Sequence, residues 1–167
     1  MSGGALEQIA HEQAKRDIID ERRPTAVPDI TFSDQLTDNM IVMRFPAERA
    51  VFAVDFIPIR RLAWKNLADA FIPDWMDAVA RVEAMEFDIL APGHGPLGTK
   101  ADATAFRQYM RELHDQVVQA DRAGKTLAEM QENIRLEAYA KWGNYDKHRK
   151  LNIEGMYNQV RLHRSSN

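Results

Sequence analysis

Two short apolar runs in the middle of the chain predict a β-hairpin. Residues 40–45 (MIVMRF) and 49–56 (RAVFAVDF) are rich in Val, Ile, Met and Phe, and the turn-like residues PAE separate them. Both runs are almost continuously apolar, which indicates strands with covered faces, as in a sandwich with helices outside.

The residues before this hairpin predict a helix followed by an extended or irregular segment. Leu and Ile lie among charged residues in 5–23, and we expect a helix for at least the second half of this segment. Residues 23–39 contain two prolines with several Asp, Ser and Thr residues, which favours an extended or irregular connection.

After the hairpin the pattern changes to the period of a helix. Apolar residues recur at helical spacing in 74–85, at Trp75, Val79, Val82 and Met85. A short apolar strand follows at 88–91. A strand, a crossover helix and a second strand form one unit, so the strands at 49–56 and 88–91 are expected in the same sheet.

From residue 101 onward the pattern is helical. The first helix carries one apolar face, at Phe106, Met110, Leu113 and Val117. Gly124 ends it, and Thr126 with Glu129 predicts a capping box for the next helix. After a break at Gly143, a last helix has Ile153, Met156, Tyr157 and Val160 at helical spacing.

These elements predict a single domain with a mixed α/β (α+β) fold. It divides into a helical and irregular lead-in (1–39), a β core (40–100) and a helical C-terminal region (101–167). The 167 residues are 45% apolar and 28% charged, as in an ordinary globular domain. With a net charge of −3, no nucleic-acid partner is expected.

Composition also narrows the possible sites and locations. No cysteine is present, so a transition metal would be held by histidine and carboxylate side chains. No apolar stretch reaches the length of a membrane span, and we expect no membrane partner. The N-terminal residues lack the basic start and apolar core of a signal peptide, which favours the cytoplasm.

Two residues at predicted strand ends are the candidates for chemistry. His94 lies between Gly93 and Gly95 in APGHGP, and Asp55 ends the run AVFAVD. Neutral imidazole is the commonest metal ligand in proteins, and carboxylates accompany it in hydrolytic sites. Each residue also has a simpler explanation: His94 could only cap backbone groups, and Asp55 could only form a turn or cap a helix.

VFAVDF (51–56), followed by DILAPGHGPLGTKADATAFRQYM (88–110), resembles the C-terminal half of the metallo-β-lactamase superfamily. The later AGKTLAEM is similar to the continuation in its glyoxalase II, lactonase and thioesterase members. The resemblance implies a partial αββα sandwich, with Asp55 as the ligand that bridges two Zn²⁺ ions and His94 as a ligand of the second. It also implies hydrolysis of a small ester, thioester, lactone or amide by metal-activated water.

The family's H-x-H-x-D-H motif is absent from this sequence. The chain has five histidines, at positions 11, 94, 114, 148 and 163. We interpret the chain as a truncated form with an internal deletion near residues 37–38 and little or no activity, and we assign no catalytic residue. His11 belongs to a strand end in this interpretation. Conceivable further metal ligands are Asp34, Asp38 and His114.

The basic stretch IRRLAW (59–64) follows Asp55 and is a weaker candidate for substrate binding. Arg60 and Arg61 beside Trp64 could contact an anionic group, although a surface salt bridge is the simpler role. The run KHRK (147–150) is expected to be a solvated face, and His114 a partly exposed helix residue.

Two other interpretations remain open. A non-catalytic remnant would leave strand edges and one sheet face uncovered, which favours a homodimer or docking on another chain. Alternatively, the chain is a small helical binding module in which PGHGP is only a turn.

Overall fold

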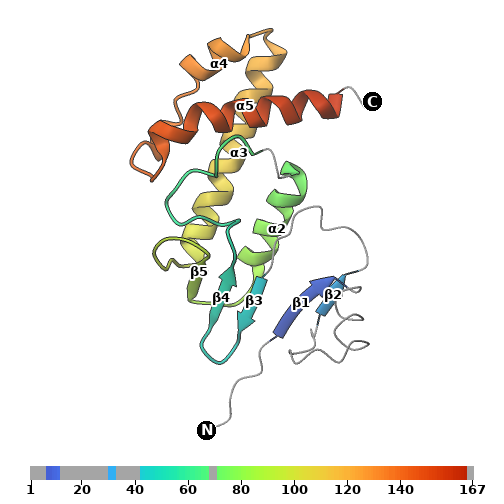
Figure 1. The fold of residues 1–167 in the computed structure, drawn as a ribbon, viewed down its shortest axis with the longest axis vertical. Coiled ribbons are helices and arrows are strands. Elements are labelled where there is room, and N and C mark those ends of the chain that lie inside the picture. Colours follow the sequence, from blue (N-terminus) through green and yellow to red (C-terminus); the bar gives the residue numbers. More distant parts are fainter. Residues whose placement is uncertain (1–6, 12–29, 33–41, 68–70, 165–167) are drawn as a thin grey trace.

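Five strands form one mixed sheet, with helices beside it and beyond one end (Figure 1). The computed structural model describes residues 7–11, 30–32, 42–67 and 71–164. The strand order is β2-β1-β3-β4-β5. The strands are β1 (Glu7–His11), β2 (Ile30–Phe32), β3 (Val42–Phe45), β4 (Ala50–Ala53) and β5 (Ile89–Pro92). The predicted mixed α/β class is confirmed.

The predicted hairpin and crossover are both present. β3 and β4 are antiparallel, and Val42 lies opposite Ala53. β5 lies parallel to β4, so that Ala53 is level with Pro92 at the carboxyl ends of both strands. The connection is helix α2 (Ile72–Ala84), whose buried Trp75 is part of the predicted apolar stripe. The two carboxyl ends therefore lie side by side at one edge of the sheet.

The sheet extends beyond the predicted β core. β1 and β2 lie within the segment predicted as a helical and irregular lead-in. β1 pairs with β2 in parallel and with β3 in antiparallel orientation, so these strands form through partners distant in sequence. His11 ends β1, as the resemblance implies. The helix predicted for the second half of 5–23 lies outside the described residues.

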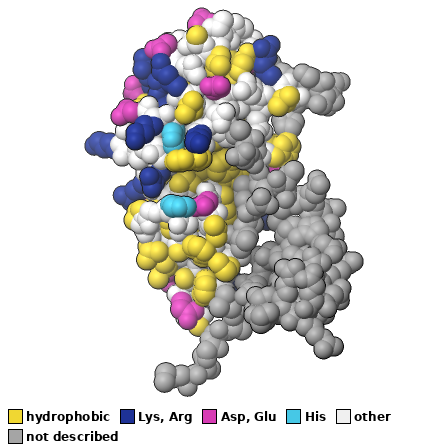
Figure 2. All heavy atoms as spheres, viewed as in Figure 1, with side chains coloured by type: hydrophobic (Ala, Val, Ile, Leu, Met, Phe, Trp, Pro, Cys, Tyr) yellow, Lys and Arg dark blue, Asp and Glu magenta, His cyan; other side chains and the backbone are white. Residues whose placement is uncertain are grey.

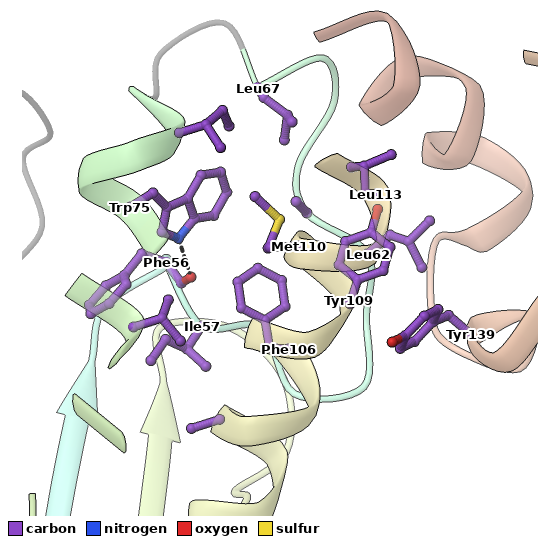
Figure 3. Packing of buried hydrophobic residues seen from close by; sticks show 14 of the residues in the cluster. Phe56, Ile57, Leu62, Leu67, Trp75, Phe106, Tyr109, Met110, Leu113 and Tyr139 are labelled. Carbon is purple, nitrogen blue, oxygen red and sulfur yellow. Dashed lines mark hydrogen bonds between the residues drawn. The ribbon is translucent and has the colours of Figure 1, made fainter. Parts of the chain in front are cut away.

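The helical C-terminal third is confirmed. It contains α3 (Lys100–Arg122), α4 (Leu127–Asn133), the short 3-10 helix η1 (Glu137–Tyr139) and α5 (Tyr145–Arg164). The predicted apolar face of α3 is buried, as Phe106 and Leu113 illustrate in the core of Figure 3. In the same view the indole Nε1 of Trp75 donates a 2.7 Å hydrogen bond to the Phe56 carbonyl, which joins α2 to the chain after β4.

Helix α5 buries polar residues that the sequence predicted to be solvated. His148 and Arg149 are each only 7% exposed, so the prediction for 147–150 is wrong at these two positions. Arg149 donates hydrogen bonds to the carbonyl oxygens of Gln131 and Ile134, at 2.8 and 2.6 Å. These carbonyls lie at the end of α4, so α5 holds α4 in place through a buried cation.

A fully buried asparagine on α5 fixes the loop that follows Asp55. Asn152 donates to the carbonyl oxygens of Ala63 and Lys65, at 3.0 and 2.5 Å, and accepts a 2.5 Å hydrogen bond from the Tyr109 hydroxyl. The loop at 59–67 is thereby tied to α5 and α3. No helix among the described residues is both long and apolar enough to span a membrane.

Candidate functional site

Asp55 and His94 meet at the carboxyl ends of the two parallel strands. Each lies two residues beyond the last residue of its strand, and those last residues, Ala53 and Pro92, are paired. His94 Nδ1 lies 2.6 Å from Asp55 Oδ1, and both side chains are largely exposed. The predicted juxtaposition of the carboxylate and the imidazole is therefore present.

The glycine before His94 is required by this contact. A Cβ atom on Gly93 would lie 2.2 Å from Asp55 Oδ1, so any side chain there would displace the carboxylate from its position against His94. Asp55 itself adopts a left-handed conformation (φ +58°), which aspartate accepts more readily than most residues. The Asp55 carboxylate thus occupies the space where any other residue at position 93 would place its Cβ.

The pairing also fixes the proton arrangement in the imidazole. A carboxylate only accepts hydrogen bonds, so the Nδ1–H of His94 donates to Asp55. In the neutral ring the lone pair is then on Nε2, the atom that a metal ion would use. The second carboxylate oxygen of Asp55 is a further oxygen donor.

These two side chains do not complete a catalytic zinc site. Such a site takes three protein ligands and a water, and the described residues contain no group of three His, Asp or Glu side chains that could hold a metal. His114 lies against Asp115 instead, with its Nδ1 3.1 Å from Asp115 Oδ1. The other conceivable ligands, Asp34 and Asp38, lie outside the described residues.

A cavity of about 430 Å³ adjoins the pair. Its lining combines a few polar groups with apolar walls: Asp55, Pro58, Arg61, Leu62, Ala63, Trp64, Trp75, Pro92, His94 and Asn144. On the face drawn in Figure 2, histidine and acidic side chains lie together, and basic side chains gather close to them. A pocket of this size with few polar groups is typical of small-molecule sites.

The three weaker candidates for substrate binding separate in the structure. Arg61 and Trp64 line the cavity together with Asp55 and His94. Arg60 does not, because its Nε lies 3.2 Å from Asp102 Oδ1 at the start of α3. The surface salt bridge weighed for this stretch thus belongs to Arg60.

The sequence did not predict the roles of Asn144 at the cavity and of His148 next to Trp64. Asn144 lines it in a left-handed conformation (φ +66°), directly after the break recognised at Gly143. His148 lies behind Trp64, with ring centroids 5.0 Å apart in an edge-to-face arrangement. Burial lowers the pKa of His148, and a hydrogen bond to the Ala63 carbonyl partly opposes this. The polar sequence around His148 carries no sign of its burial.

Comparison with solved structures finds metallo-β-lactamase among the similar folds. The metallo-β-lactamase from Pontibacter korlensis is 18% identical and covers 62% of this chain and 57% of its own, with a TM-score of 0.41. VMB-1, crystallised at pH 5.5, is 16% identical over 60% of this chain and 54% of its own, with a TM-score of 0.40. The chain spans little more than half the length of either. No protein-family model and no curated protein matches it.

Proposed function

We propose that this chain carries part of the metal centre of a metallo-β-lactamase-type hydrolase. The 2.6 Å contact between His94 Nδ1 and Asp55 Oδ1 at paired strand ends is the observation on which the proposal rests. It joins the two residues that the sequence resemblance matches to metal ligands, beside a cavity of suitable size for a small ester, thioester, lactone or amide. When bound, Zn²⁺ would supply an activated water for hydrolysis of such a substrate.

This chain by itself is expected to show little or no turnover. Two protein ligands bind Zn²⁺ weakly and do not poise a hydroxide near neutral pH, since known catalytic sites use three. The chain's own contribution is to orient the imidazole through Asp55 and to supply the cavity walls. Arg61 and Trp64 are the residues that we propose for substrate contact.

Zinc titration by calorimetry tests the proposal. We expect weak binding by the wild type and a clear loss of it in His94→Ala, whereas His114→Ala, a matched change on α3, should bind as the wild type does. Identical zinc binding by the wild type and His94→Ala would contradict the proposal and indicate that PGHGP is only a turn. Assays with excess zinc on ester, lactone and thioester panels should show no rate above background, and a clear rate would contradict the expected inactivity.

Association through the sheet is the alternative function. Phe52 and Ala91 are level on adjacent strands and partly exposed, and Ile89 on the same face is 40% exposed. The outer edge of β5 is closed, because Leu90 exchanges two backbone hydrogen bonds with Gly98. A homodimer would therefore use this face rather than the edge of β5. Light scattering after size-exclusion chromatography tests it, and a monodisperse monomer would contradict it.

A further inference from the structure

We propose that the ligand of the cavity carries an anionic group, a carboxylate or a phosphate, which Arg61 binds while Trp64 contacts the adjoining apolar part. This inference adds to the proposed function. It rests on that function only where it treats the ligand as the substrate. The binding of the anion itself depends on the cavity and its charges alone.

The backbone and side chain of Arg61 are held in place from two sides. The Gly143 amide donates to the Arg60 carbonyl (2.8 Å), and the Leu62 amide donates to the Gly143 carbonyl (2.9 Å), so the two loops are paired around Arg61. A Cβ on Gly143 would lie 3.0 Å from Arg61 Cγ, and one on Gly95 would lie 3.6 Å from a guanidinium nitrogen. The guanidinium therefore runs between the loop of His94 and the loop before α5.

The positive charge of Arg61 is not neutralised within the described part of the chain. No carboxylate there forms an ion pair with it, in contrast to neighbouring Arg60, which pairs with Asp102. Asp55, which lines the same cavity, already accepts from His94. An arginine placed in a cavity without a carboxylate partner is suited to bind a planar carboxylate or a phosphate with two parallel hydrogen bonds.

Two lysines outside the cavity lining add positive charge near Trp64. Lys65 and Lys147 line a second pocket together with His148, whose charged form they and Arg61 disfavour. Neither lysine forms an ion pair with a carboxylate among the residues that the structure describes; Lys65 Nζ lies 5.5 Å from the centre of the Trp64 ring. Their charges would help to draw an anionic ligand toward Arg61, which is the cation that lines the cavity.

Trp64 gives this anion site an apolar side. It is 65% exposed although it lines the cavity, and the imidazole of His148 and the ammonium group of Lys65 lie close to its ring. The remaining walls include Leu62 and Pro58. A ligand with an aromatic or acyl body and one anionic group would thus match both parts of the cavity.

Nuclear magnetic resonance titration without zinc tests the inference. The probes are benzoate and phenyl phosphate, with benzyl alcohol as the neutral counterpart, and the readouts are the Arg61 Nε and Trp64 indole signals. We expect an anion to shift both signals and benzyl alcohol to shift them at least tenfold more weakly. Which anion binds more tightly identifies the group. Shifts that are absent with both anions, or equal with the alcohol, would overturn the inference.

Paired arginine variants give the second test. Arg61→Met should weaken binding of the preferred anion about tenfold or more, since a charge-assisted bidentate contact is lost. The adjacent Arg60→Met should change it less than twofold. Equal effects of the two variants would contradict the inference. Arg61→Lys keeps the charge and should bind the anion with intermediate strength. This variant tests the inference even if Arg61→Met does not fold. Because zinc is absent, failure of zinc binding and failure of anion binding are separate results.

Discussion

Replacing Asn152 by alanine should release the loop that carries Arg61 and Trp64. The side chain is fully buried and takes part in three hydrogen bonds, two to loop carbonyls and one from the Tyr109 hydroxyl. At about 1 kcal/mol for each net hydrogen bond, the loss in free energy of unfolding is about 3 kcal/mol. For a chain of this size, this corresponds to a decrease in melting temperature of about 6–12 °C.

Urea unfolding followed by circular dichroism measures this loss. Asn158→Ala, an exposed asparagine on the same helix, is the matched control and should change the unfolding free energy by less than about 0.5 kcal/mol. Tyr109→Phe removes one of the three hydrogen bonds and should cost about 1 kcal/mol. If Asn152→Ala lost less than about 1 kcal/mol, the buried asparagine would not be what ties the loop to α5.

Two further predictions concern α5. Gly155→Ala should destabilise the fold by about 1–3 kcal/mol in urea unfolding, because its Cβ would lie 1.8 Å from the Asn66 carbonyl oxygen. This clash should outweigh the better helix propensity of alanine. An increase in stability would show that this packing is loose. Since burial lowers the pKa of His148 in the folded state, the unfolded chain binds that proton more tightly, so stability that is present above pH 6.5 is lost as the pH falls below it. Unfolding measured from pH 8 to 5 should show a weaker pH dependence in His148→Gln than in the control His114→Gln, and equal slopes would refute this assignment.

Local patterns predicted the part of the fold that determines the site. The hairpin, the crossover helix and the apolar face of α3 each follow from periodicity within one segment. The contact between Asp55 and His94 follows from two parallel strands that end at the same level. Where a residue's neighbours lie in the same or an adjacent element, the sequence was sufficient.

The remaining features depend on contacts between distant segments. β1 and β2 form by pairing within the sheet, and their own sequence favoured other structures. His148 lies among charged residues in the sequence but is covered by the loop that contains Ala63. Arg60 pairs with Asp102 on α3, whereas Arg61 lies against Gly143, because their side chains leave the backbone on different sides. The periodicity of the local sequence predicts none of these three features.

The central claim is that Asp55 and His94 act together as ligands of one divalent cation. Nitrogen resonances of the imidazole rings, followed while Zn²⁺ is added below saturation, report which histidine binds first. We predict that the His94 resonances shift before those of the other four rings, and that Asp55→Ala removes this preference. If another histidine shifted first, or if Asp55→Ala left the His94 shifts unchanged, the claim would be contradicted.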